Sequence, residues 1–108
     1  MKFLCLAYGT EDDWLALSQE ERERLLAGDD RLRERGAFIS VLGEPTMVQA
    51  WNRTVARSRE PYARSDAPLV GFSIVEACDV DEVVSLVADT PCAVAKGAIE
   101  IRPLLDPP

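Results

Sequence analysis

The sequence predicts a single α+β domain in which helices pack against an antiparallel sheet. Two stretches, KFLCLAY at 2–8 and VGFSIVEA at 70–77, are short, apolar and without helical periodicity, as buried strands are. Two others, at 18–21 and 79–82, have the capping-box pattern of a helix N-terminus. A length of 108 residues suits one domain.

The chain is expected to begin with the strand at 2–8, which Gly9 ends. Residues 10–17 can form a short helical turn in which Trp14 and Leu17, three residues apart, pack together.

A longer helix is expected from the Ser18 cap to Arg35, where Gly36 stops it. The sequence Gly-Asp-Asp at 28–30 favours helix poorly, so a kink is possible there. The acidic side chains of this helix are expected to face solvent, and its inner stripe consists of Leu25, Leu26 and Leu32.

A second strand is expected at 37–42, followed by a hairpin with strands at 47–51 and 54–58. Its turn is Asn52-Arg53, and asparagine tolerates the left-handed conformation that such a turn needs. Trp51 either caps the hairpin or contacts a partner subunit.

The second half of the chain supplies the remaining strands and helix. After the strand at 70–77, Asp79 caps a helix that is over by Thr90-Pro91. The final strand, AIEIR at 98–102, alternates apolar and charged residues, and Pro103 ends it. The inner face of this second helix consists of Val80, Val83, Val84 and Val87.

Without the hairpin, this order is the βαββαβ pattern of a ferredoxin-like domain, with two helices on one face of an antiparallel sheet. The strands at 2–8 and 70–77 are apolar on both faces, and the helices cover only one of them. A second copy of the sheet, packed face to face, is the simplest cover, so a homodimer is expected.

Composition excludes several classes of function. The net charge of −7 and the presence of only two lysines disfavour a nucleic-acid binder or a polybasic membrane patch. The apolar start is too short for a signal sequence or a membrane span, so we expect a cytoplasmic protein without membrane partners.

The cysteines predict packing rather than chemistry. The three cysteines, Cys5, Cys78 and Cys92, are widely spaced and lie among apolar residues. Because the chain also has no histidine, neither disulfides nor a zinc site is expected. The chain also lacks a nucleophile elbow, a phosphate loop and a dinucleotide fingerprint, so no metal and no cofactor are predicted.

Several segments resemble one family. The stretch REPYARSDAPLVGF at 59–72 is similar to the loop of the DGPF branch of the YCII-related family, with Tyr62 at the phenylalanine position. Matching positions in this stretch are Pro61, Ala63, Gly71 and Phe72. Further segments that resemble the family in the same order are KFLCLAYG, LRERGAF, VDEVVSLVADTP and IEIRPL.

The resemblance implies a homodimer of the dimeric α/β-barrel type and a small-molecule enzyme with a cleft between sheet and loop. Family members are expected to use a histidine and an aspartate, or the loop aspartate. Here Arg59 stands at the position of that aspartate and Glu60 at the following glycine. Either catalysis has moved to other groups or the domain only binds.

The candidate site residues lie on the stretch at 59–66 and at the end of the first strand. Asp66 and Tyr8 are the expected catalytic groups, since Asp66 is flanked by small residues rather than arginines. Expected substrate contacts are Arg59, Glu60, Tyr62 and Arg64. Tyr62 matches an aromatic residue that is expected to pack under the loop, with its hydroxyl group as an additional donor toward the cavity. The arginines of 53–64, a local +3, can instead pair with the acidic segment 11–35, which carries −4.

Two functions follow as expectations. One is a cofactor-independent isomerase, lyase or cyclase acting on an anionic or polyketide-like metabolite in the cavity of a homodimer. The alternative is a catalytically degenerate family member that binds a ligand or a protein partner.

Overall fold

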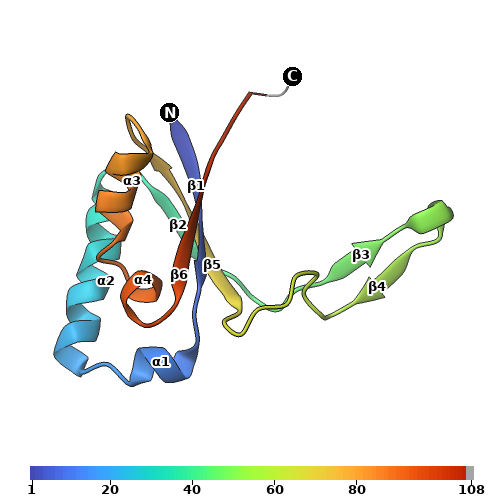
Figure 1. The fold of residues 1–108 in the computed structure, drawn as a ribbon, viewed down its shortest axis with the longest axis horizontal. Coiled ribbons are helices and arrows are strands. Elements are labelled where there is room, and N and C mark those ends of the chain that lie inside the picture. Colours follow the sequence, from blue (N-terminus) through green and yellow to red (C-terminus); the bar gives the residue numbers. More distant parts are fainter. Residues whose placement is uncertain (107–108) are drawn as a thin grey trace.

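A computed structural model describes residues 1–106, and Figure 1 shows its helices gathered on one side of a sheet. The sheet has the strand order β2-β5-β1-β6, and every neighbouring pair is antiparallel. The α+β prediction is therefore confirmed. The four strands are β1 (Lys2–Tyr8), β2 (Phe38–Val41), β5 (Leu69–Glu76) and β6 (Ala98–Pro103).

Two of the helices, α2 and α3, begin at the predicted caps. The Ser18 hydroxyl accepts a hydrogen bond from the Glu21 amide at 3.1 Å, and the Asp79 carboxylate accepts one from the Glu82 amide at 2.9 Å. These contacts satisfy amide groups that a helix start otherwise leaves without partners. The helices are α1 (Glu11–Leu15), α2 (Gln19–Glu34), α3 (Val80–Val87) and α4 (Pro91–Val94).

Two details of the helices differ from the prediction. Helix α2 runs without interruption through residues 28–30, where a kink was possible. Helix α4 was missed, because the Thr90-Pro91 step was taken as the end of helical structure. Pro91 is instead the first residue of α4, where a missing amide hydrogen does no harm.

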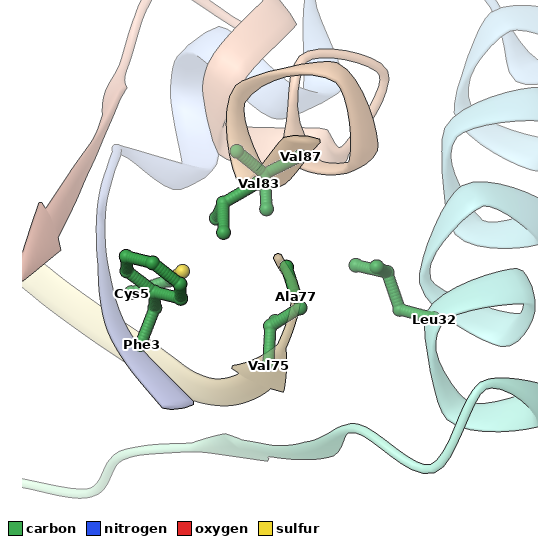
Figure 2. Close-up of a cluster of buried hydrophobic side chains, with 7 residues drawn as sticks. All are labelled: Phe3, Cys5, Leu32, Val75, Ala77, Val83 and Val87. Atoms are coloured by element: carbon green, nitrogen blue, oxygen red, sulfur yellow. The ribbon is translucent and has the colours of Figure 1, made fainter. Parts of the chain in front are cut away.

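The hydrophobic core lies between the helices and one face of the sheet. Figure 2 shows Phe3 and Cys5 of β1 and Val75 of β5 on the sheet side of the cluster, with Val83 and Val87 of α3 opposite. On α2, Leu25 and Leu32 are buried as predicted, whereas Leu26 is 49% exposed. On α3 the predicted inner face is narrower than expected, because Val80 and Val84 are about half exposed.

No described helix covers the opposite face of the sheet (Figure 1). This face is apolar over the middle of β2, β5 and β1 and charged at the β6 edge, where Glu100 and Arg102 form an ion pair. Strand alternation places on it the side chains that lie between the core-facing ones. The Phe38 ring is 59% exposed and lies 5.7 Å from the ring of Phe72, centroid to centroid. We call this surface the open face; its apolar residues are Leu4, Leu6, Phe38, Phe72 and Ile74.

A two-stranded hairpin projects from the sheet on the side away from the helices (Figure 1). Its strands are β3 (Met47–Gln49) and β4 (Ala56–Ser58), joined by the 3₁₀ turn η1 (Trp51–Arg53). We call residues 47–58 the arm. The hairpin is confirmed, but its strands are shorter than predicted because Asn52 and Arg53, with φ of 54° and 65°, belong to a longer turn.

Within residues 1–106, no helix has the length and hydropathy that crossing a bilayer requires.

Candidate functional site

A cavity of about 470 Å³ lies between the helices and the core-facing side of the sheet. Strands β1, β2, β5 and β6 form its floor, and α1, α2 and α4 contribute to its walls. A volume of this order fits a small-molecule ligand. The lining is mainly apolar and includes Trp14, Leu26, Leu32, Ile39, Val87 and Ile99.

Asp29 lines this cavity from the middle of α2. It follows Leu25 by four residues and precedes Leu32 by three, so it shares the inner stripe of the helix with two buried leucines. Burial raises the pKa of the Asp29 carboxyl, the Arg33 guanidinium acts in the opposite direction, and the Asp30 charge raises it further. The expectation that the acidic residues of this helix face solvent is therefore wrong for Asp29.

Cys92 lines the same cavity from α4. Burial raises the pKa of its thiol, and the negative charge of Asp29 raises it further. A side chain at Gly9 would bring its Cβ to 3.2 Å from the Cys92 sulfur, and one at Gly97 would collide with the Tyr8 carbonyl oxygen. These two glycines allow the chain around α4 to lie directly against the end of β1.

The cysteine prediction is confirmed in part. All three thiols are free; Cys5 is buried and Cys92 is half-buried, as packing residues are. Cys78 is exposed, so the packing prediction is wrong for it, because it follows the end of β5 and precedes the cap of α3.

The charges around the cavity define which ligands suit it. Among the residues that line it, Glu11 and Asp29 are acidic and none is lysine or arginine. The lining residues with hydroxyl groups are Thr10, Ser40, Ser73 and Thr90. Such a lining favours a neutral, largely apolar molecule over an anion. Within the described residues, no cluster of three or more metal-ligating side chains occurs.

The residues predicted on the connector between β4 and β5 lie outside this cavity. These five residues are Arg59, Glu60, Tyr62, Arg64 and Asp66, and all of them are exposed. The only ion pair among them is a loose one between Arg64 and Glu60, whose nitrogen and oxygen atoms lie 3.9 Å apart. Tyr62 is 78% exposed, so the expectation that it packs under the loop is wrong in the single chain.

Tyr8 also lies outside the cavity. Its neighbour Ala7 is among the lining residues and Tyr8 is not, and successive strand residues point to opposite faces. Tyr8 thus belongs to the open face. Neither Tyr8 nor the five connector residues are among those that line this cavity.

The predicted pairing of the arginine segment with acidic residues is not found within one chain. Among residues 1–106, Arg53, Arg57 and Arg59 form no ion pair.

The sequence contained one signal for the cavity that was not used. A carboxylate at the i+4 position of an otherwise apolar helical stripe is unusual, since aspartate is almost never fully buried without a partner. The spacing Leu25, Asp29, Leu32 marks Asp29 in this way. Cys92 has no comparable signal, because its place depends on a helix that sequence reasoning missed.

The fold and the site together define an α+β protein with a cavity between its helices and its antiparallel sheet. The family model for the YCII-related domain matches residues 1–107. The chain therefore belongs to the YCII-related family, as its sequence motifs predicted. No protein of curated function matches it significantly.

Proposed function

We propose that the chain binds a small neutral, polyketide-like metabolite in the cavity between helices and sheet, and transfers a proton within it. The reaction class is a cofactor-independent isomerisation, elimination or cyclisation. The observation that carries this proposal is Asp29, a half-buried carboxyl group in a mainly apolar cavity of about 470 Å³.

A carboxylate in this setting is suited to act as a general base. Its raised pKa makes it a stronger proton acceptor than an exposed aspartate, and the apolar walls limit its hydration. The Asp29 carboxylate would take a proton from a carbon next to a carbonyl, which leaves an enolate. The carboxyl would then return the proton to a different carbon, so an isomerisation balances without a further reactant.

Cys92 has a different part in this proposal. Because burial and the charge of Asp29 both raise the pKa of its thiol, Cys92 stays protonated and forms a wall of the cavity. The absence of lysine and arginine among the lining residues disfavours the anionic substrates that the sequence also suggested.

The same proposal includes a homodimer. The domain would be ferredoxin-like, and two copies would pair through their open faces as a dimeric α/β barrel. The exposed Phe38 ring and its apolar neighbours support this pairing, since a surface of this kind seldom faces water. Membership of the DGPF branch and a cytoplasmic location stay predictions from the sequence.

An alternative site would require that homodimer. Tyr8 and the connector both lie outside the helix-side cavity, so a site with Asp66 and Tyr8 as catalytic groups depends on a second copy. Arg59 and Arg64, with Glu60 and Tyr62, would there hold an anionic substrate. The exposed arginines favour this alternative; a protein that only binds its ligand is the other outcome.

Occupancy of the cavity is tested with N-phenyl-1-naphthylamine, a neutral fluorescent probe of apolar sites. Ala7→Leu adds bulk to the cavity floor and is expected to reduce probe binding at least tenfold. Ala27→Leu makes the same change on the exposed side of α2 and is the matched control. Equal probe affinity in both variants would show that the cavity does not bind small apolar molecules.

The chemistry is tested by NMR in D₂O, through exchange of the α-protons of acetylacetone, a neutral 1,3-diketone. The protein is expected to accelerate exchange, and Asp29→Asn to abolish the acceleration while probe binding persists. Loss of the acceleration in Asp66→Asn or Tyr8→Phe instead would move the reaction to the alternative site. Binding without acceleration in the unmodified protein would identify a binding protein.

A further inference from the structure

Among residues 1–106, no other strand pairs with the arm, residues 47–58. Its two strands form a separate sheet and pair only with each other among the described residues. It carries exposed apolar side chains along its length, with Val48 58%, Trp51 75% and Val55 65% exposed. An isolated two-stranded hairpin is at best marginally stable in water, so this arm needs a surface to pack on.

The turn of the arm is nevertheless well formed. Asn52 and Arg53 both adopt the left-handed conformation, and backbone hydrogen bonds of 3.0 and 3.1 Å link Arg53 to Ala50 and Thr54 to Trp51. A residue other than glycine adopts this conformation at an energetic disadvantage. Two such residues in succession are what a tight hairpin turn requires, so the turn gives the tip of the arm, with Trp51, a defined backbone geometry.

The exposed area of the chain fits a subunit of a dimer better than a monomer. Its accessible surface is 8077 Å², whereas a compact monomer of 11.9 kDa exposes about 5,900 Å². Its radius of gyration is 15.8 Å, against about 13 Å for a compact chain of this length. The excess, roughly 2,000 Å², lies in the range that one subunit of a tightly associated homodimer buries.

Charge identifies the partner of the arm as a second copy of this chain. Residues 47–66 contain four arginines and two acidic residues, which gives this segment a net charge of +2. The rest of the chain therefore carries −9. Arg53 and Arg57 are on the arm itself and have no ion-pair partner among the described residues. A basic arm on a strongly acidic body is complementary to the body of an identical subunit.

We propose that each arm packs across the second subunit of a homodimer, with Trp51 as its apolar anchor and Arg53 and Arg57 against acidic side chains of that subunit. Two-fold symmetry makes the contact reciprocal, so both arms are covered at once. The inference rests on the pairing of two copies proposed above and adds that the arm, beyond the open face, holds them together.

The first test measures the dissociation constant of the dimer by sedimentation. Trp51→Ser is expected to weaken it by on the order of thirtyfold, because buried tryptophans are frequent anchors of interfaces. Val55→Ser is expected to weaken the dimer less than Trp51→Ser does. Val80→Ser is the matched control: it makes the same substitution on α3, outside the arm, and should leave the dissociation constant unchanged. Replacement of Arg53 and Arg57 by glutamate should weaken the dimer most at low salt.

The second test uses the two tryptophans of the chain as separate reporters. In Trp14→Phe the only remaining tryptophan is Trp51. Its emission should shift to shorter wavelength, and acrylamide should quench it less, as the protein passes from monomer to dimer with rising concentration.

The outcomes separate this inference from the proposals it builds on. If the arm substitutions leave the dissociation constant of the dimer unchanged, and the Trp51 emission does not shift when the dimer forms, the inference is overturned and the open-face pairing stays intact. A monomer at all concentrations would overturn both. Binding of the naphthylamine probe to the cavity between the helices and the sheet does not depend on either result, so it tests the proposed function separately.

Discussion

Replacement of Gly28 by alanine should destabilise the protein, although helix propensity alone predicts the reverse. Gly28 lies inside α2, where alanine is favoured over glycine by about 1 kcal/mol. A Cβ built at this position would lie far inside van der Waals contact with the Asp89 carbonyl oxygen, which is backbone and cannot swing aside.

The surroundings of Asp89 limit the relief of this clash. Its side chain accepts hydrogen bonds from Arg24 at 2.6 Å and from Arg31 at 3.4 Å, one on each side of Gly28 along α2. Moving α2 away would also break these contacts. Overpacking of this kind costs about 3 kcal/mol, so the net destabilisation after the gain in helix propensity is about 2 kcal/mol. That corresponds to a fall in Tm of roughly 10 °C for a domain of this size.

The assay is thermal and urea unfolding of both proteins at one protein concentration, since association contributes to stability. Gly43→Ala is the control, because its Cβ would meet nothing within 4 Å. It should change the stability by less than about 1 kcal/mol. A Gly28→Ala protein with a Tm equal to or above that of the original chain would refute the close approach of α2 to Asp89.

The remaining predictions concern the core and the cavity. Leu25→Ala should lower the free energy of unfolding by about 3 kcal/mol in urea titrations, because Leu25 is fully buried; a loss under 1 kcal/mol would contradict this. Since folding raises the pKa of Asp29, the folded state binds its proton more tightly, and stability should fall as pH rises through the window above the ordinary aspartate pKa. Asp29→Asn should remove this dependence and be the more stable protein above the window, as paired unfolding curves at several pH values would reveal. A thiol-reactive disulfide reagent should modify Cys78 well before Cys92, and Asp29→Asn should accelerate the Cys92 reaction; equal initial rates at the two cysteines would count against the burial of Cys92.

The sequence was sufficient to predict the strands and the starts of α2 and α3, because these depend on local patterns. Side-chain caps at Ser18 and Asp79 act within three residues, and the apolar run of β1 needs no knowledge of its neighbours. The arm was predicted as a hairpin for the same reason. Its projection from the body was not, since that depends on what the hairpin packs against.

The site was harder to predict, because it has no local pattern. The connector at 59–66 attracted attention through its charges and its resemblance to a family motif, and it is exposed in the single chain. The cavity is instead lined by residues from most elements of the fold, between one and four from each. Only Asp29 could have been singled out, through its spacing from Leu25 and Leu32.

The adjacency of Gly28 and Asp29 has a consequence for how the cavity would select the ligand proposed above. Gly28 holds the middle of α2 against the chain that follows α3, so the helix can neither rotate nor slide without losing that contact. The backbone of Asp29, one residue further on, therefore cannot carry the carboxyl away from the cavity to accommodate a guest, and only rotation of its side chain remains. Discrimination at this cavity should be rigid: a molecule enters if it already offers a group that tolerates the carboxyl, and adaptation by the protein contributes little.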